Sequence, residues 1–348
     1  MGTQAMRIVD ANCNRISEGL RFLEDVSRFT LNDQALSRQI RDLRHTIAKN
    51  ITVLGNSPLS ERDAAGDIGA KFDPSNQHQD MPSLVAANAK RIEEGLRIIE
   101  ELAKLPELSA FLRSTDFQQM RFTVYTIERD LTGKLLRKTT VQKIKGLYAI
   151  IDTSMIGTRN ACDIASHMIL GGVKIIQLRD KSSTKAALFV IAQQLKQLCQ
   201  QSGILFIIND HLDIALAVAA DGIQIGQDDL PISVVRNTIP IEMIIGCSVY
   251  SAAQAQKAQT DGADYIGVGA IFATSTKNEV TIIGLEGLQQ IRNTIAIPIV
   301  AIGGINTQNI AGVMATGVDA AAVISALITS DDIEKTARTL ATYAEVNT

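Results

Sequence analysis

Cysteine is scarce in this sequence, and the four that occur (Cys13, Cys162, Cys199 and Cys247) show neither CxxC spacing nor a paired framework. This scarcity excludes a disulfide scaffold and argues against a zinc site built on cysteine pairs. No apolar run approaches the ~20 residues that a membrane span requires, and the chain does not open with the pattern of a signal peptide. These absences predict a cytoplasmic protein with reduced thiols and no membrane partner.

The sequence also lacks an excess of positive charge. Its 348 residues contain 34 Lys and Arg against 37 Asp and Glu, which leaves a formal net charge of -3. Non-specific binding of nucleic acid normally requires a strongly basic balance, so we expect no nucleic-acid partner. The hydrophobic fraction of 46% is sufficient for a large core, and the length favours two domains.

A duplicated segment marks the first part of the chain. Residues 11–24 (ANCNRISEGLRFLE) return 76 residues later as residues 87–100 (ANAKRIEEGLRIIE), with nine of fourteen positions identical. In both copies small and apolar residues recur at helical spacing and form one stripe. The stripe consists of Ile16, Leu20, Leu23 and Ser27 in the first copy and of Ile92, Leu96, Ile99 and Ala103 in the second. Because this region shows almost no sheet pattern, we predict an all-α helical domain over residues 1–135.

Each copy places a glycine inside its expected helix, Gly19 in the first and Gly95 in the second. Glycine costs a helix interior about 1 kcal/mol relative to alanine, so its recurrence indicates the close approach of another backbone or of a ligand. Two interpretations stay open at this point: helix–helix packing across a pseudo-twofold pair, or a ligand site between the repeats. Between the copies, Asp63 and Asp67 could bind a metal or shape a turn.

Charged residues of the helical domain are expected mainly at its surface. The packing interpretation places pairs such as Glu24 with Arg28 on solvated helix faces. Residues 136–145 (LRKTTVQKIK) are basic and lack both helical and strand periodicity. We therefore predict that they form a solvated linker to the second domain.

From residue 146 to residue 348, short apolar runs alternate with amphipathic segments. Eight runs are candidate strands: Leu147–Asp152, Val173–Arg179, Leu205–Asp210, Gly222–Gly226, Ile244–Tyr250, Tyr265–Phe272, Ile297–Ile302 and Ala321–Ser325. The helical segments between them include Ala186–Cys199, Ala252–Thr260, Gly287–Asn293 and Asn309–Thr316. Eight such units in about 200 residues predict an α/β domain of the (β/α)₈ TIM-barrel type. A doubly wound open sheet is the alternative, but the first turn carries no dinucleotide fingerprint.

Polar side chains follow several of these strands. They are Gln177, Arg179 and Lys181 after the second, Asn209 and Asp210 after the third, Asp228 and Asp229 after the fourth, and Ser248 at the end of the fifth. Guanidinium and ammonium groups bind phosphate oxygens, whereas carboxylates bind Mg²⁺. We therefore predict a site for a magnesium-bound diphosphate, with Asp210 and Asp229 as metal ligands and Asp228 as the competitor of Asp229. A helix N-cap is the alternative role for each aspartate.

The last three strands end in groups that suit oxyanions. The sixth runs into Thr274, Ser275, Thr276 and Lys277, the seventh into Gly303 and Gly304, and the eighth into Ile324 and Ser325. TIM barrels commonly bind a phosphate at the loops after strands 7 and 8, so we predict a second phosphorylated substrate there. His167 and His211 are the only histidines in this half, and neither has a partner that suggests a triad. Electrostatic assistance to a leaving group is therefore favoured over covalent catalysis.

The segments QLRDK, NDHLDIALAVAADGIQIGQDDLP, GCS, GADYIGVG, TSTK and AIGGI, in this order across residues 146–340, resemble thiamin-phosphate synthase. That family joins hydroxymethylpyrimidine diphosphate to hydroxyethylthiazole phosphate and releases pyrophosphate with Mg²⁺, so the resemblance implies a transferase of thiamine biosynthesis. It implies that the pyrimidine diphosphate is bound by Gln177, Arg179, Lys181, Asn209, Ser248 and Lys277, with Asp210 and Asp229 on the metal. It further implies that Thr274, Thr276, Gly303 or Gly304, Ile324 and Ser325 hold the thiazole phosphate, and we count Ser275 with this substrate-binding group. We expect Arg179, Lys181, Ser248 and Lys277 to act in catalysis.

Some positions depart from the pattern of that family. Ala270 and Ala273 stand where proline is usual, Gln224 stands where histidine is usual, and the segment Asn278–Ile283 lacks the common prolines. Missing prolines increase the freedom of the backbone, so the loop after the sixth strand is expected to be less stiff. A barrel that isomerises a thiazole phosphate without synthase activity is the rival function, and the intact charged residues argue against it.

The N-terminal domain resembles a domain found fused to thiamin-phosphate synthases. The shared features are the paired ANxxRxxEGLR segments, RDxxxDxG at residues 62–69 and an MRF motif at residues 120–122. That domain is associated with phosphorylation of hydroxymethylpyrimidine phosphate, so the resemblance implies ATP as a cosubstrate. The region contains neither GxxxxGK[ST] nor GxGxxG, so such chemistry would use an unfamiliar nucleotide site. The alternative is a non-catalytic dimerisation or scaffold module, which leaves a homo-oligomer open.

Overall fold

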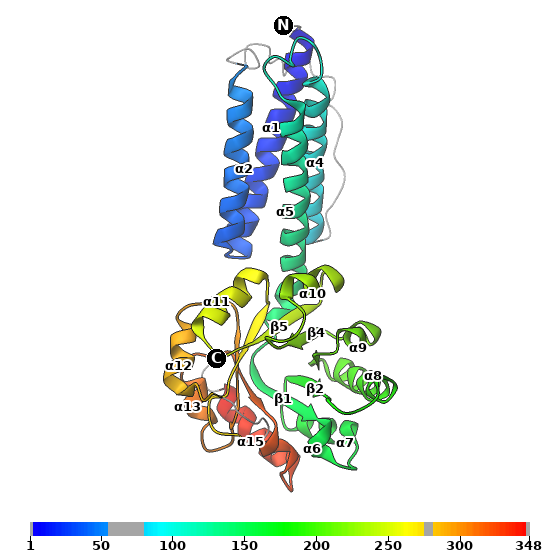
Figure 1. Ribbon diagram of the computed structural model, residues 1–348, viewed down its shortest axis with the longest axis vertical. Coiled ribbons are helices and arrows are strands. Elements are labelled where there is room, and N and C mark those ends of the chain that lie inside the picture. Colours follow the sequence, from blue (N-terminus) through cyan, green and yellow to red (C-terminus); the bar gives the residue numbers. More distant parts are fainter. Residues whose placement is uncertain (1–2, 55–79, 275–280, 346–348) are drawn as a thin grey trace. The chain divides into compact units, whose positions relative to one another are not determined.

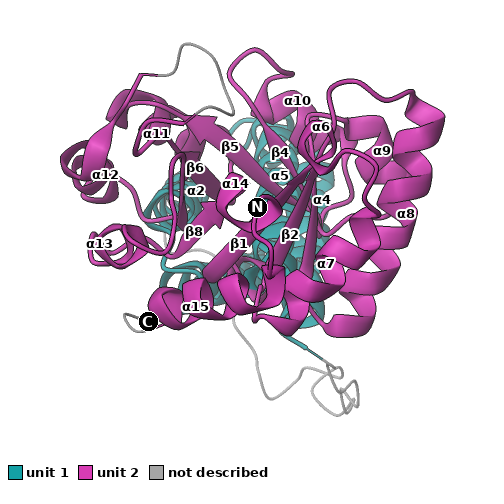
Figure 2. Cartoon of the chain, turned by 90° about the horizontal axis from the view of Figure 1, so that it is seen from below, with its two compact units in different colours: residues 1–138 teal, residues 139–348 magenta. Residues whose placement is uncertain are grey.

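Two compact units make up the chain in this computed structural model, residues 1–138 and residues 139–348 (Figures 1 and 2). The structure describes residues 3–54, 80–274 and 281–345. Asp63 and Asp67, which the sequence offered as metal ligands or turn residues, lie outside the described residues. In the described part of the chain, no helix has the length and apolar character that crossing a membrane requires.

The first unit is helical, as predicted. Its long helices are α1 (Thr3–Asp25), α2 (Gln34–Thr52), α4 (Met81–Leu102) and α5 (Ser114–Val141), and a π-helical turn, η1 (Val26–Thr30), follows α1 directly (Figure 1). Asp33 and Asp80 cap the N-termini of α2 and α4 by accepting hydrogen bonds from the backbone N–H groups of Leu36 and Ser83. The stripe predicted on both repeat helices lies in the core, because all eight of its residues are at most 2% exposed.

The repeat glycines are explained by packing between helices α1 and α4. A Cβ atom added to Gly19 would lie 2.6 Å from Cγ1 of Ile92, and one added to Gly95 would lie 2.9 Å from Cγ1 of Ile16. Ile16 and Ile92 are equivalent residues of the two repeats, so each glycine receives the isoleucine of the other copy. This reciprocal contact supports the packing interpretation and leaves no space for a ligand at these glycines.

The duplication extends to the second helix of each pair. The segment LRHTI at residues 43–47 of α2 matches MRFTV at residues 120–124 of α5. In the first pair, Nη2 of Arg44 donates to Glu24 at 3.1 Å, and in the second, Nη2 of Arg121 donates to Glu100 at 3.1 Å. Glu24 is therefore buried between helices and does not sit on a solvated face, because its carboxylate joins α1 to α2.

The linker between the units is shorter than the sequence suggested. Helix α5 continues to Val141, so residues 136–141 are helical and only residues 142–145 connect the helix to the first strand. Leu131 and Leu135 are buried, and the side chain of Arg137 is 6% exposed. The last turns of α5 are thus stabilised by packing, which the basic composition of this segment did not reveal.

The second unit is a closed barrel of eight parallel strands in sequence order, which confirms the predicted TIM barrel (Figure 2). The strands are β1 (Gly146–Asp152), β2 (Ile175–Arg179), β3 (Leu205–Asn209), β4 (Gly222–Ile225), β5 (Ile244–Val249), β6 (Tyr265–Val268), β7 (Ile299–Ile302) and β8 (Ala320–Val323). Strand β8 closes the barrel on β1, with Gly146 opposite Ala320. Strand β6 ends four residues before the predicted Phe272, since Ile271 and Phe272 donate backbone hydrogen bonds to Ile302 and Gly303 instead.

Helices cover the outer face of the barrel, except that the short α14 (Ser325–Ile328) lies over the centre of the ring of strands in the view of Figure 2. The others are α6 (Thr153–Ile156), α7 (Ala161–Leu170), α8 (Lys185–Ser202), α9 (Leu212–Ala217), α10 (Ile232–Thr238), α11 (Ala252–Asp261), α12 (Gly284–Arg292), α13 (Ile310–Met314) and α15 (Ile333–Glu345). One core fills the layer between strands and helices. A second cluster inside the barrel contains Ile175, Leu205, Ile207 and Ile244, so the interior below the site is a packed core and not a channel.

Candidate active site

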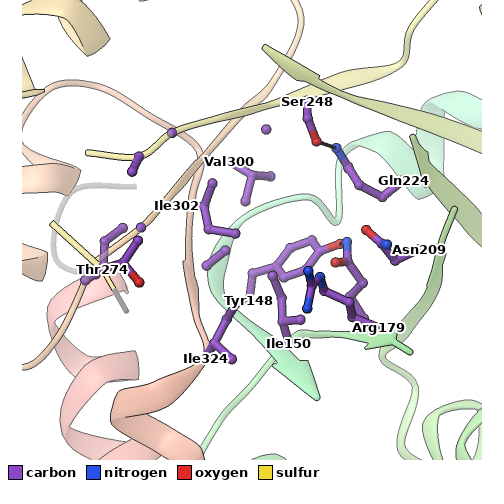
Figure 3. Close-up of a pocket in the computed structure, with 18 of the residues that line it drawn as sticks. Tyr148, Ile150, Arg179, Asn209, Gln224, Ser248, Thr274, Val300, Ile302 and Ile324 are labelled. Carbon is purple, nitrogen blue, oxygen red and sulfur yellow. Dashed lines mark hydrogen bonds between the residues drawn. The ribbon is translucent and has the colours of Figure 1, made fainter. Parts of the chain in front are cut away.

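A cavity of about 160 Å³ opens among the carboxyl ends of the barrel strands (Figure 3). Residues from β1 to β8 or from the segments that follow them line it, as expected for a TIM-barrel site. The sequence-predicted residues on its wall are Gln177, Arg179, Asn209, Ser248, Thr274, Gly303, Gly304, Ile324 and Ser325. The fold therefore brings together side chains that lie up to 148 residues apart in the sequence, between positions 177 and 325.

Arg179 is held at one side of the cavity by a carboxylate from the neighbouring strand. Asp152 ends β1 and Arg179 ends β2, and the two residues are directly paired in the sheet. Nη1 of Arg179 donates to Oδ2 of Asp152, whose other oxygen accepts hydrogen bonds from the N–H and the hydroxyl of Ser154 at 3.0 and 2.6 Å. Asp152 is only 2% exposed, so it fixes the guanidinium while leaving other N–H donors for a ligand.

Two buried tyrosines form the floor of the cavity. The hydroxyls of Tyr148 and Tyr265 lie 3.4 Å apart, and Nε2 of Gln177 donates to Tyr148 at 2.8 Å. Burial in the barrel raises the pKa of both phenols, so they stay neutral at physiological pH. The amide of Gln177 is thereby oriented by the floor, and its side chain is 4% exposed.

The wall above β4 and β5 is formed by a second amide–hydroxyl pair. Nε2 of Gln224 donates to Oγ of Ser248 at 3.1 Å, the contact drawn as a dashed line in Figure 3. A Cβ atom at Gly246 would overlap both Gln224 and Tyr265, so glycine at this strand position makes room for the two side chains. Gln224, at the position where the resembled family usually has histidine, therefore acts as a neutral, buried donor to Ser248.

Two aspartates that follow β3 and β4, Asp210 and Asp229, interact with each other. Burial raises the pKa of Asp210, and the nearby carboxylate of Asp229, which shares a hydrogen bond with it, raises this pKa further. Lys181 lowers it by its positive charge. Two adjacent carboxylates beside a lysine are a favourable arrangement for a divalent cation, because the cation removes their mutual repulsion.

The helix N-cap alternative finds no support for these two aspartates. Helix α9 begins after His211 and α10 begins after Pro231, and neither cap involves an aspartate side chain. Oδ2 of Asp229 instead accepts the backbone N–H of Gly226 at 2.7 Å, which aims the carboxylate back toward the strand ends. Within the described ranges, no group of three or more His, Cys, Asp or Glu side chains is arranged to hold a metal.

The opposite side of the cavity is formed by Thr274 and by the loops after β7 and β8 (Figure 3). Gly303 and Gly304 have φ values of 106° and 66°, a left-handed conformation that favours glycine. Nδ2 of Asn309 donates to the carbonyl of Gly304 at 2.9 Å and holds the turn. Ser275, Thr276 and Lys277 lie outside the described residues, so their predicted roles remain predictions.

The segment after β6 is held by backbone hydrogen bonds although it lacks the usual prolines. Ala270 is 4% exposed, and its carbonyl accepts the N–H of Ile283 at 2.8 Å. The N–H groups of Ile271 and Phe272 donate to the end of β7 and to Gly303 at 3.0 Å each. The predicted loss of stiffness therefore does not extend to residues 270–272, where cross-strand bonds replace the restriction that proline would impose.

Sequence reasoning missed Asp152 and the tyrosine floor. Asp152 ends the first strand in the same way that Arg179 and Asn209 end theirs, so its position at a strand terminus could have revealed it. Tyr148 and Tyr265 gave no such signal, since a tyrosine inside an apolar strand usually belongs to the core. Their contact joins residues of β1 and β6, which only the closed barrel brings together.

Comparison with known proteins finds a match for each of the two regions. Residues 147–327 match the family model described as thiamine monophosphate synthase, and residues 7–130 match that of the ThiD2 family. In the solved structures, the thiamine phosphate pyrophosphorylase of Pyrococcus furiosus is 40% identical, with a TM-score of 0.55, and the match covers 59% of this chain and 98% of that one.

Curated relatives match along nearly the whole chain. The thiamine-phosphate synthase of Thermosynechococcus vestitus is 36% identical over 342 residues, which cover 97% of this chain and 95% of the relative. The thiamine-phosphate synthase of Synechocystis sp. is 35% identical over 350 residues, covering 99% and 98%. These relatives carry both regions, so the helical unit and the barrel occur together in them. The chain therefore belongs to the thiamine-phosphate synthase family and is a transferase of thiamine biosynthesis.

Proposed function

We propose that the barrel couples hydroxymethylpyrimidine diphosphate to hydroxyethylthiazole phosphate and releases pyrophosphate. The observation that carries this proposal is that one cavity has two different sides. Arg179 and Asn209 lie at one side, near the Asp210–Asp229 pair, whereas Thr274 and the loops after β7 and β8 lie at the other (Figure 3). Two phosphorylated substrates would thus meet above the neutral tyrosine floor with their charged groups pointing apart.

The reaction breaks the bond between the pyrimidine methylene carbon and the diphosphate oxygen, and the electron pair leaves with pyrophosphate. The thiazole nitrogen then forms a carbon–nitrogen bond to the same methylene carbon. Arg179, fixed by Asp152, stabilises the charge that develops on the leaving group. Asn209 and the Gln224–Ser248 pair supply neutral donors and acceptors that orient the pyrimidine ring, and the two-sided cavity holds both reactants in line.

Mg²⁺ fits the carboxylate pair. Asp210 and Asp229 would hold it, and Lys181 would stay beside the diphosphate as a further positive charge. When bound, the ion neutralises charge on the diphosphate and makes it a better leaving group. Asp228 lies next to Asp229 in the sequence and is exposed, which makes it a matched control for the metal assignment.

The deciding experiment mixes both phosphorylated substrates with Mg²⁺ and the folded protein and measures pyrophosphate release. We expect turnover, and we expect Asp229→Ala to reduce kcat/KM by roughly 10²–10³-fold, the range for losing one preorganised electrostatic group. Asp228→Ala should change it by less than roughly fivefold. No release by the folded protein would overturn the proposed reaction, and equal losses at the two aspartates would contradict the metal assignment alone.

For the helical unit we propose phosphorylation of hydroxymethylpyrimidine phosphate with ATP, supported by the ThiD2 match over residues 7–130. The product would be the diphosphate that the barrel consumes, and we place both steps in the cytoplasm. ATP consumption by the intact chain with hydroxymethylpyrimidine phosphate tests this role. If ATP is not consumed, the molecular mass in solution, measured with and without residues 1–138, shows whether the unit is a dimerisation module instead.

A further inference from the structure

An arginine-rich hollow lies on the helical unit. It is lined by Arg21, Glu24, Asp25, Arg28, Arg41, Arg44 and His45, which come from α1, η1 and α2. We call this set the arginine hollow. Four guanidinium groups against two carboxylates leave an excess of two positive charges in the hollow when His45 is neutral. The synthase reaction takes place in the barrel and gives this cluster no role.

Glu24 is the anchor of the arginine hollow. It is 5% exposed, and its two oxygens accept hydrogen bonds from Nε of Arg41 at 2.9 Å and Nη2 of Arg44 at 3.1 Å. Burial pushes the pKa of Glu24 up, but the two arginines outweigh that effect and hold the pKa below its ordinary value. The carboxylate therefore stays charged and fixes two guanidinium groups in place.

Donors remain available after Glu24 is satisfied. Arg41 uses Nε for the anchor and Arg44 uses Nη2, so both Nη groups of Arg41 and Nη1 of Arg44 make no bond to Glu24. Nε of Arg44 is buried and has no hydrogen-bond partner. Among the described residues, Arg21 and His45 also form no hydrogen bond or ion pair. A buried, unsatisfied guanidinium N–H costs free energy, so Glu24 alone does not satisfy the donors of Arg44.

The backbone at the hollow is unusual. Arg28 lies in the π-helical turn η1, a local structure that is rare and frequent at functional sites. Oγ of Ser27 donates to the carbonyl of Glu24 at 2.7 Å, and Nζ of Lys138 donates to the carbonyl of Thr30 at 2.8 Å. These bonds hold both ends of the turn, so Arg28 is presented to the hollow by a fixed backbone.

The second repeat shows that such a hollow is not a by-product of the fold. By the repeat spacing, Arg97 corresponds to Arg21, and Arg97 pairs with Glu100 at 2.6 Å and Glu101 at 2.8 Å. Arg121, the counterpart of Arg44, pairs with Glu100 and also donates to Tyr125 at 2.8 Å. In the second copy both arginines are thus paired with carboxylates. Among the described residues of the first copy, Arg21 has no carboxylate partner, and Arg28 stacks on the ring of Phe29 at 4.8 Å from its centroid.

We propose that the arginine hollow binds the phosphate group of a small phosphorylated molecule. Planar guanidinium groups match phosphate oxygens with paired N–H donors, and a phosphate monoester carries about −1.5 to −2 charges at pH 7, which matches the excess charge of the hollow. The chain's net charge of -3 argues against a polyanion such as nucleic acid. Binding here is separate from the synthase site and does not require that the unit transfer a phosphoryl group.

The test is calorimetric titration of the intact chain carrying Arg179→Ala, which weakens phosphate binding at the diphosphate side of the barrel. Binding that remains at the loops after β7 and β8 is common to all variants and cancels when they are compared. The probes are inorganic phosphate, hydroxymethylpyrimidine phosphate and ATP. Comparing their affinities shows whether the bound phosphate group belongs to a phosphorylated pyrimidine or to a nucleotide. Adding Arg21→Gln with Arg28→Gln should weaken binding of the effective probe by at least roughly tenfold, since the two changes remove charge-assisted hydrogen bonds to the phosphate. The matched change in the second repeat, Arg97→Gln with Lys104→Gln, should alter binding by less than twofold.

Three outcomes would overturn the inference. These are equal weakening by the two double variants, unchanged affinity in the first, or no binding of any probe by a chain whose helical circular dichroism is normal. Arg21 and Arg28 are both exposed, so neither change should prevent folding. Phosphate binding without ATP consumption would support the arginine hollow while contradicting kinase activity, so the two proposals fail independently.

Discussion

The barrel and the helical unit differ in how they treat the polar groups that they bury. In the barrel, Gln177 and Gln224 bond to neutral hydroxyls, and Arg179 is held by Asp152 at the edge of an open cavity. In the helical unit, Glu24 and Glu100 are enclosed between helices and are each neutralised by two arginines. Polar residues of the barrel are therefore free to serve a ligand, whereas those of the helix pairs mainly join helices.

This difference has a physical origin in the two folds. Parallel strands of a closed barrel all end at one rim, so side chains at their ends converge on a space that no core residue fills. Helices that pack along their length leave no such rim, and a buried carboxylate is tolerated there only when it is paired. Changes in the barrel should thus affect catalysis more than stability, and changes in the buried pairs of the helical unit should do the reverse.

The largest effect is expected from Arg179→Ala. Loss of a preorganised guanidinium at the leaving group should reduce kcat/KM for pyrophosphate release by about 10³-fold, or about 4 kcal/mol in transition-state stabilisation. The barrel should also lose some stability, because Asp152 is left as a buried carboxylate without its arginine, but less than the activity loss, since Asp152 keeps its bonds to Ser154. Asp152→Asn is the companion variant, and it should lower kcat more than it raises KM. A loss of stability as large as the loss of activity would contradict the expectation that changes in the barrel affect catalysis more than stability.

The next effect concerns the buried carboxylate of the second helix pair. Glu100 is 3% exposed and accepts from Arg97 and Arg121, so Glu100→Gln removes the carboxylate that pairs with Arg121, whereas Arg97 keeps its pair with Glu101. We expect the helical unit to lose about 3 kcal/mol of unfolding free energy, the low end of the range for breaking a buried ion pair. Chemical denaturation followed by circular dichroism measures this, and synthase turnover should stay within twofold. Unchanged stability would show that the pair does not hold the helices together.

A smaller effect should appear at the glycine contact between α1 and α4. Gly19→Ala places a Cβ atom against Ile92 and should destabilise the helical unit by about 1–2 kcal/mol through overpacking. Once Ile92→Ala has removed the contact, the same Gly19→Ala change should stabilise by up to about 1 kcal/mol, because alanine favours the helix. Gly95→Ala with Ile16→Ala repeats the cycle in the other copy. If Gly19→Ala changed the stability in the same direction with Ile92 present and after Ile92→Ala, close packing would not be the reason for glycine at this position.

The smallest effect depends on pH. Burial and the neighbouring Glu128 raise the pKa of Glu93 to about 7. A raised folded-state pKa means that stability is fully present below the unfolded value near 4.5 and is lost as the pH rises through 7. Glu93→Gln should therefore stabilise the helical unit at pH 8 by about 1 kcal/mol or less, since Glu93 is only half-buried and water screens it. At pH 4 the variant and the native chain should be equally stable, and an equal gain at both pH values would contradict this origin.

Several features could be predicted because they depend on local pattern. The eight strands were placed correctly by their apolar runs, and the residues at and after the strand ends include nine that line one cavity. The repeat helices followed from the periodic stripe. Element ends were less predictable, as with β6 and α5, because hydrogen bonds to a neighbouring loop or burial against other helices decided where each element stopped.

The sequence by itself determined the order of strands and helices, the duplicated helix and the chemistry available at each strand end. Periodicity and composition are local properties, so they can be read without knowing which segments meet. Only the tertiary structure decided that Asp152 holds Arg179, that Tyr148 meets Tyr265, and that Gly19 receives Ile92. It also distinguished the open arginine hollow from its neutralised counterpart in the second repeat. Each of these depends on a contact between distant segments, which closing the barrel and pairing the helices create.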